Sequence, residues 1–283
     1  MKSCVRKLAW IDLMEKDLIE IDLNKSVDKN ASEYFEKAKL ARRKIDGIKK
    51  AVAHTEKKIL ENAEKEKISS AILDKTFIKK RAKKWFEKYR WFFSSDSFLV
   101  IGGKDAHSNE EVVKKRMEKN DVYFHADVFG APHCIIKTGG KTVPEQTMKE
   151  AAQFAVSFSK AWEEGRAGAD AYSVSPEQVS KKAPSGESMG TGAFMIYGER
   201  KWFKNVPLSC AIGYFEKENV LMSAPFSAVK KNCSFFVEIK QGRLKKSDAA
   251  KMLKKIFELK GTVFSVDDFV SALPNGFFEI FEK

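Results

Sequence analysis

One stretch of the sequence, DVYFHAD at residues 121–127, predicts the fold more directly than any other. Apolar and polar side chains alternate along it, and successive side chains of a β-strand point to opposite faces of a sheet. Val122 and Phe124 are therefore expected to face a core. The opposite face carries the other members of the stretch, Asp121, Tyr123, His125 and Asp127.

A second strand is expected at residues 133–137, after a turn at Gly130. In such a hairpin His133 lies near His125, and three interpretations of this face remain open. The histidines can be satisfied in a core or turn. They can contact RNA together with Tyr123, because rings stack on unpaired bases. They can also hold a metal with Asp127 or Cys134, but no spacing here is diagnostic of a metal site, so no metal is predicted.

Strands and short helices alternate from Phe92 to the end of the chain. This pattern predicts an α+β (mixed α/β) fold with a mixed sheet. Four parts are expected. They are an N-terminal segment with a short strand at 1–27, a basic coiled-coil arm at 28–93, an RNA-binding domain at 94–215, and a C-terminal α/β extension at 216–283.

The arm carries a heptad of apolar or small residues, the pattern of a coiled-coil seam. Its members are Tyr34, Ala38, Ala41, Ile45, Ile48, Val52, Thr55 and Ile59. Residues 68–73 can be the tip of a hairpin, with a return helix through Phe77, Arg81, Trp85 and Tyr89. A single continuous helix is the alternative.

Positive charge is concentrated in this arm. Residues 28–90 hold 20 Lys and Arg against 10 Asp and Glu, which accounts for +10 of the net charge of +13. A solubilising surface would mix the two signs, so contact with phosphate groups is favoured over solubility alone. A basic loop at 179–186 offers Lys181 and Lys182 in the same role, or is an ordinary exposed loop.

The overall composition points to an anionic partner, since the pI is about 9.4. No apolar run is long enough to span a bilayer, and the first residues do not resemble a signal peptide, so a cytoplasmic protein without membrane contact is expected. Among the four cysteines there is no C-x-x-C pair. No catalytic set stands out, so neither an enzyme nor a cofactor is predicted.

Five stretches together resemble the NFACT-R domain, the RNA-binding domain of the NFACT ribosome quality-control family. They are WFEKYRWF at 85–92, LVIGGKD at 99–105, DVYFHAD at 121–127, VSKKAPSG at 179–186 and TGAFMIYG at 191–198. The resemblance covers residues 18–215, including the coiled coil. Residues 216–283 resemble the C-terminal extension of archaeal members. The family includes the nuclear export mediator factor of eukaryotes and bacterial RqcH.

The resemblance implies a function. Family members bind the large ribosomal subunit obstructed by a peptidyl-tRNA, recruit tRNA, and support tailing of the stalled chain without mRNA. The NFACT-N domain, which holds the main tRNA contacts of the family, is not recognised in this sequence. The chain is therefore expected to dock on ribosomal RNA and tRNA and to support tailing. The residues predicted to bind RNA are Lys80, Arg81, Lys83, Lys84, Arg90, Lys104, Asp121, Tyr123, His125, His133, Lys181 and Lys182.

Two other functions compete with this one. The heptad arm can serve as a scaffold that docks a ubiquitin ligase or a separate NFACT-N half. The cluster of His125, Asp127 and His133 can be the centre of a metal-dependent enzyme.

Overall fold

The computed structural model describes residues 8–12, 18–75, 82–182 and 189–281. The chain divides into two compact units, Met1–Lys75 and Thr76–Lys283. The finer boundaries expected at residues 27, 93 and 215 stay predictions.

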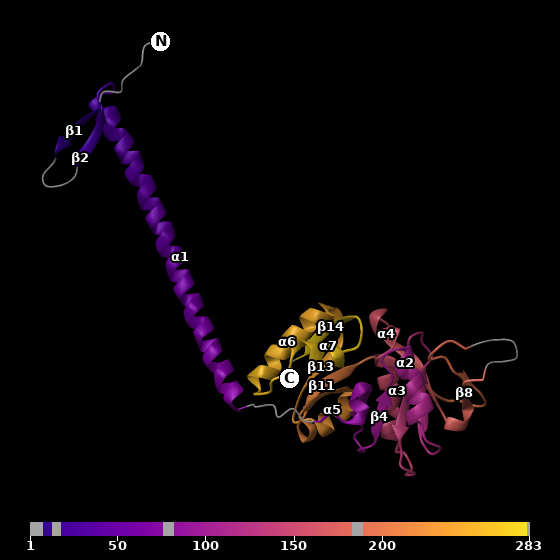
Figure 1. Ribbon diagram of the computed structural model, residues 1–283. Coiled ribbons are helices and arrows are strands. Elements are labelled where there is room, and N and C mark those ends of the chain that lie inside the picture. Colours follow the sequence, from indigo (N-terminus) through magenta and orange to yellow (C-terminus); the bar gives the residue numbers. More distant parts are fainter. Residues whose placement is uncertain (1–7, 13–17, 76–81, 183–188, 282–283) are drawn as a thin grey trace. The chain divides into compact units, whose positions relative to one another are not determined.

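The first unit is a β-hairpin joined to a long helix (Figure 1). Strands β1 (Leu8–Asp12) and β2 (Leu18–Asp22) pair antiparallel, and α1 runs from Val27 to Lys75. The Ser26 hydroxyl accepts a hydrogen bond from the Lys29 amide at 3.3 Å, as an N-cap does. The Asn30 side chain accepts a bond from the Asp22 amide at 2.9 Å, and the Tyr34 hydroxyl donates to the Glu20 carbonyl at 2.7 Å. These bonds fix the hairpin on the first turns of α1.

Helix α1 is continuous for 49 residues, so the single helix is found and not a hairpin with its tip at 68–73. The predicted return helix is wrong where it can be checked. Residues 76–81 lie outside the described part, Trp85–Lys88 form a 3-10 turn (η1), and a strand begins at Arg90. Among the described helices, none combines the length and apolarity needed to cross a bilayer.

The second unit contains a six-stranded sheet in the order β10-β7-β5-β6-β4-β3. Its strands are β3 (Arg90–Phe93), β4 (Leu99–Gly102), β5 (Val122–Ala126), β6 (Cys134–Lys137), β7 (Gly168–Val174) and β10 (Lys201–Pro207). The α+β class is confirmed. The expected mixing of strand directions is not found, because every pairing between the described strands is antiparallel.

Both faces of this sheet are covered. Helix α3 (Glu145–Ser157) packs Phe154 against Phe92, Phe124 and neighbouring side chains on one face. The elements on the other face are η1, α2 (Ala106–Glu111), the π-helical turn η2 (Val112–Arg116), β8 (Val179–Ser180) and β9 (Met195–Ile196). Tyr123, on that second face, is consequently fully buried.

A four-stranded sheet follows, in the order β12-β11-β13-β14. Its strands are β11 (Cys210–Phe215), β12 (Val220–Ala224), β13 (Phe235–Lys245) and β14 (Phe277–Phe281). Phe236 meets Phe226 of α5 (Phe226–Asn232), whereas its neighbour Phe235 meets Phe257 of α6 (Lys246–Leu259). Because adjacent strand residues point to opposite faces, α5 covers one face, and α6 with α7 (Val266–Ala272) covers the other.

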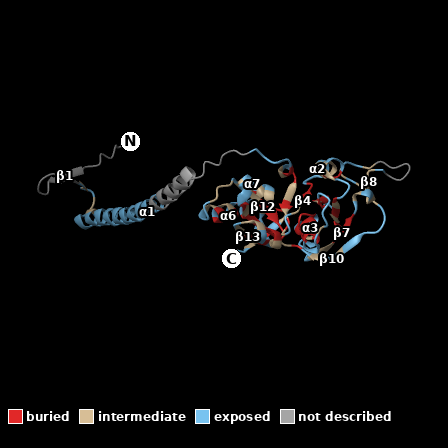
Figure 2. Cartoon of the chain, turned by 90° about the horizontal axis from the view of Figure 1, so that it is seen from below, coloured by how far each residue is buried: buried red, intermediate tan, exposed pale blue. Residues whose placement is uncertain are grey.

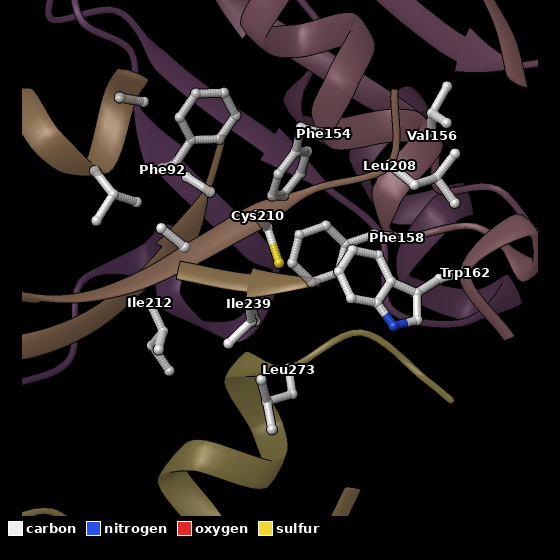
Figure 3. Close-up of a cluster of buried hydrophobic side chains, with 14 of the residues drawn as sticks. Phe92, Phe154, Val156, Phe158, Trp162, Leu208, Cys210, Ile212, Ile239 and Leu273 are labelled. Carbon is white, nitrogen blue, oxygen red and sulfur yellow. The ribbon is translucent and has the colours of Figure 1, made fainter. Parts of the chain in front are cut away.

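The two sheets share one core. Figure 3 shows Phe158 and Trp162 beside Cys210, Ile239 and Leu273 from the C-terminal part. The Trp162 indole, at the end of α4 (Lys160–Glu163), donates to the Phe277 carbonyl of β14 at 3.1 Å. In Figure 2 this interior is red, whereas the described side chains of α1 are exposed almost throughout. The second unit is thus held together across the whole range from η1 to β14.

Candidate nucleic-acid interface

Tyr123, His125 and His133, predicted from DVYFHAD and the strand after it to share one face, do lie together in the structure, but inside the protein. Tyr123 has no exposed surface, and only 8% of His133 is exposed. The Tyr123 hydroxyl is hydrogen-bonded to Nδ1 of His133. The His125 ring stacks on the His133 ring with 4.5 Å between centroids, and its Nδ1 lies 3.1 Å from the Pro132 carbonyl oxygen. Of the three interpretations, this geometry favours satisfied core histidines.

Burial controls the protonation of this network. It raises the pKa of Tyr123 well above the usual range, so the phenol stays protonated. Its O–H group donates a hydrogen bond to the imidazole. Burial, together with the neighbouring His125, lowers the pKa of His133 to about 3. His133 is therefore neutral at physiological pH, and it contributes no positive charge that would attract RNA.

The stability of the fold should consequently depend on pH. In an unfolded chain a histidine has a pKa of about 6.5. Between about pH 3 and pH 6.5 the His133 side chain is therefore protonated in the unfolded state and neutral in the folded state. The free energy of unfolding should fall as the pH drops below 6.5, by up to about 1.4 kcal/mol per pH unit from His133. Urea unfolding between pH 7 and pH 5 measures this slope. His133→Gln should flatten it, and an unchanged slope would contradict the assignment.

Asp121 is a structural carboxylate in this arrangement. Its side chain is 1% exposed and forms an ion pair with Lys137 at 2.6 Å. It also accepts hydrogen bonds from the backbone amides of Glu118 at 2.8 Å and Thr138 at 3.1 Å. A carboxylate enclosed in this way presents no free face to RNA, so we leave it out of the interface.

Lys181 also interacts with other residues of the protein. Its ammonium group pairs with Glu110 at 3.0 Å, donates to the carbonyls of Gly190 and Ala193, and lies 4.9 Å from the centre of the Phe194 ring. This clamp holds the segment after the basic loop against α2. Lys182 is exposed and remains available for an anion.

No metal centre emerges from the described part of the chain. Within it, no group of three or more His, Cys, Asp and Glu side chains is arranged to hold a metal ion. The imidazoles of His125 and His133 are instead turned to the Pro132 carbonyl and the Tyr123 hydroxyl. The metal-enzyme hypothesis therefore has no geometric support here.

Three other predicted residues meet in a cleft. Lys83, Arg90 and Lys104 line a hollow of about 590 Å³ whose opposite wall includes residues of β12 and α7. The Arg90 guanidinium lies 4.6 Å from the centre of the Phe158 ring. Burial lowers the pKa of Arg90 to about 10. Sequence reasoning named these three residues but gave no reason to group them.

The remaining predicted residues are not part of this cleft. Lys80 and Arg81 lie outside the described residues. Lys84 is exposed and forms an ion pair with Glu218.

A surface that the sequence reasoning missed lies on the outer strand β10. Trp202 is 39% exposed there. The Lys204 ammonium lies 4.2 Å from its ring centre, and the Arg200 guanidinium lies 5.8 Å from it and 4.6 Å from the Tyr172 ring. A hollow of about 440 Å³, lined partly by Arg200, Lys201 and Ser175, is present at the same edge. We call Arg200, Trp202 and Lys204 the β10 edge cluster. The close grouping of basic and aromatic residues in RKWFK at 200–204 was the available signal.

Comparison with known proteins points to one family. Residues 88–198 match the family described as the NFACT protein RNA binding domain. The chain is 42% identical over 206 residues to the archaeal Rqc2 homolog aRqcH of Methanocaldococcus jannaschii, covering 72% of this chain and 30% of that protein. It is 36% identical over 208 residues to the ribosome quality control complex subunit NEMF homolog of Drosophila melanogaster, covering 72% of this chain and 20% of that protein.

The human ribosome quality control complex subunit NEMF is 37% identical over 178 residues, which cover 61% of this chain and 16% of that protein. The chain thus spans less than a third of the length of these relatives. The described residues of the five stretches that suggested NFACT-R lie on the sheet, on the elements that cover it and on the segments next to them. The chain carries an NFACT RNA-binding domain and belongs to the NFACT ribosome quality-control family.

Proposed function

We propose that this chain is an RNA-binding component of ribosome-associated quality control. It docks on the RNA of the large ribosomal subunit and on tRNA of stalled complexes, and it supports tailing of the nascent chain. It acts in the cytoplasm, without a cofactor and without catalysing a reaction itself. The names of the fly and human relatives, which place those proteins in a ribosome quality control complex, support this role.

One observation carries the proposal: the β10 edge cluster combines an exposed indole with two cations. Aromatic rings take up unpaired bases by stacking, and adjacent cations hold the phosphates on either side. Within the described residues the Arg200 guanidinium makes no ion pair. The Lys204 ammonium group forms an ion pair with the Asp170 carboxylate at 2.7 Å. Arg200 is accordingly the stronger phosphate ligand of the two.

The arm supplies a second basic surface. Helix α1 is about 70 Å long at 1.5 Å per residue, and its middle carries Arg42, Arg43, Lys44, Lys49 and Lys50 on exposed positions. Such a row of cations suits the backbone of structured RNA, because it neutralises phosphates whatever the sequence.

Binding to large ribosomal subunits and to tRNA, measured at several salt concentrations, tests the proposal. Affinity should fall steeply with salt, since a protein that makes about six phosphate contacts loses about 1,000-fold between 50 and 200 mM. Trp202→Ala should weaken binding by about tenfold, the loss of one stacked base. Trp85→Ala is the matched control, because Trp85 is 44% exposed and is likewise covered by an arginine, Arg116 at 4.9 Å. No binding at low salt, or equal losses from both variants, would contradict the proposal.

A scaffold function is the alternative, and the exposed seam of α1 supports it. Ile45, Ile48 and Val52 are 50%, 62% and 49% exposed, so the heptad face has no partner within the described residues of its unit. A helix from a ubiquitin ligase or from an NFACT-N half fits such a seam. Ile48→Lys separates the two functions. Subunit binding that survives this change favours RNA docking, whereas its loss favours the scaffold.

A further inference from the structure

The cleft around Arg90 has the features of a ligand site. Its volume of about 590 Å³ lies in the range of small-molecule pockets. It is formed where β3, at the end of the six-stranded sheet, meets β12 of the four-stranded sheet. It therefore exists only because residues of the C-terminal part pack against the NFACT-R sheet.

The ammonium groups of Lys83 and Lys104 form no ion pair within the part of the chain that the structure describes. Among the described residues the Arg90 guanidinium forms no ion pair or hydrogen bond and rests on the Phe158 ring. Burial lowers the pKa of Lys104, and the charges of Arg90 and Lys83 lower it further. Three positive groups, those of Lys83, Arg90 and Lys104, thus line one cleft and repel one another, which is unfavourable unless an anion joins them.

The two carboxylates that line the cleft are engaged elsewhere. The Asp268 carboxylate accepts bonds from the amide and the hydroxyl of Ser265 at 2.8 and 2.7 Å, as the capping box of α7. The Glu87 carboxylate accepts a bond from the Lys84 amide at 2.6 Å. Both carboxylates therefore have local roles in the folding of α7 and η1.

The rest of the lining is apolar or carries hydroxyl groups. Trp91, Phe264, Leu221 and Val220 offer a surface for a flat ring, and Ser271 offers a hydroxyl. A planar guanidinium with nearby ammonium groups suits phosphate, whose oxygens a guanidinium can bind in pairs. A space this large, with such a wall beside the cations, suits a phosphate that carries a base.

We propose that this cleft binds a single nucleotide unit, with Arg90, Lys104 and Lys83 at its phosphate and the apolar wall against its base. The nucleotide can come from an RNA chain or be free in solution. In the first case the proposal rests on the proposed function and deepens it by adding a phosphate-selective site apart from the β10 edge cluster. In the second case it stands by itself.

Calorimetric titration of the whole chain at low salt tests the proposal, with adenosine 5′-monophosphate, adenosine, and tetranucleotides with and without a 5′-phosphate as probes. The monophosphate should bind and adenosine should not. Tighter binding of the phosphorylated tetranucleotide than of the monophosphate identifies RNA as the source, and the reverse order identifies a free nucleotide. Lys104→Gln and Arg90→Gln should each weaken binding about 10- to 100-fold, the loss expected for a charge-assisted hydrogen bond.

Lys84→Gln is the matched control, because Lys84 follows Lys83 in sequence but pairs with Glu218 and does not line the cleft. Arg90 is partly buried, so the Arg90→Gln result counts only if the variant unfolds at the same urea concentration as the parent protein. If Arg90→Gln unfolds earlier, the result for the exposed Lys104 decides the test. Absence of monophosphate binding, binding that Lys104→Gln leaves unchanged, or stronger binding of an acidic peptide would overturn the proposal. If the chain binds large subunits but not the monophosphate, only the nucleotide-site proposal is overturned. If the chain binds the monophosphate but not large subunits, only the proposed function is overturned.

Discussion

Asp121→Asn should destabilise the protein by about 3 kcal/mol, the effect of removing one partner of a buried ion pair. Asn has a single acceptor oxygen, whereas the carboxylate serves the Glu118 amide, the Thr138 amide and the Lys137 ammonium group. Lys137 itself is only 15% exposed and would keep an imperfectly compensated charge. Urea unfolding measures the loss. Affinity for large subunits should be unchanged under conditions where the variant is folded.

Glu118→Gln is the control for this prediction. Glu118 also pairs with Lys137, at 2.9 Å, but its side chain is 71% exposed, and exposed pairs contribute about 1 kcal/mol or less. The two variants thus remove the same kind of charge from the same lysine in different surroundings. A stable Asp121→Asn variant that no longer binds RNA would restore the sequence-based prediction that Asp121 is an RNA ligand.

Trp162→Ala should cost about 3–5 kcal/mol, the range for removing a large buried aromatic side chain. The Trp162 ring is 1% exposed, lies 5.8 Å from the Phe278 ring, and donates its N–H to the Phe277 carbonyl. Gln241 reinforces the junction by donating to the carbonyls of Ala161 and Trp162, both at 3.1 Å. Because the two sheets share this core, we expect one unfolding transition at a lower urea concentration.

Trp202→Ala serves as the control here, since an exposed position should lose about 1 kcal/mol or less. Near-ultraviolet circular dichroism and tryptophan fluorescence should report the same midpoint for Trp162→Ala. Two separate transitions, with residues 216–283 melting first, would contradict a shared core and would support the predicted boundary at residue 215.

The sequence predicted local structure well where one period dominated. Alternation in DVYFHAD located β5 to within one residue at each end, and the heptad located α1. The sequence pattern did not reveal which elements cover the polar face of β5. That depends on Phe194 and Lys181, which are brought onto the His133 side of the sheet by a connection far along the chain. A period of two separates the faces of a strand, but it carries no information about a third element.

The candidate site was predictable to a similar extent. Net charge and family motifs predicted Lys83, Arg90 and Lys104 as separate RNA contacts, but the cleft that these residues line exists only through packing of β12 and α7. Lys181 was chosen for its charge, and the structure shows that charge neutralised by Glu110. The β10 edge cluster was overlooked because RKWFK resembles an ordinary exposed strand until its position at the sheet edge is known.

A structure of the chain bound to a large ribosomal subunit that carries a peptidyl-tRNA tests the central claim most directly. We predict that RNA lies against the β10 edge cluster, with a base on Trp202 and a phosphate at Arg200, and that α1 follows the RNA backbone. A complex in which the β10 edge cluster faces solvent, and the chain touches only proteins through the seam of Ile45, Ile48 and Val52, would contradict RNA docking and establish the scaffold function instead.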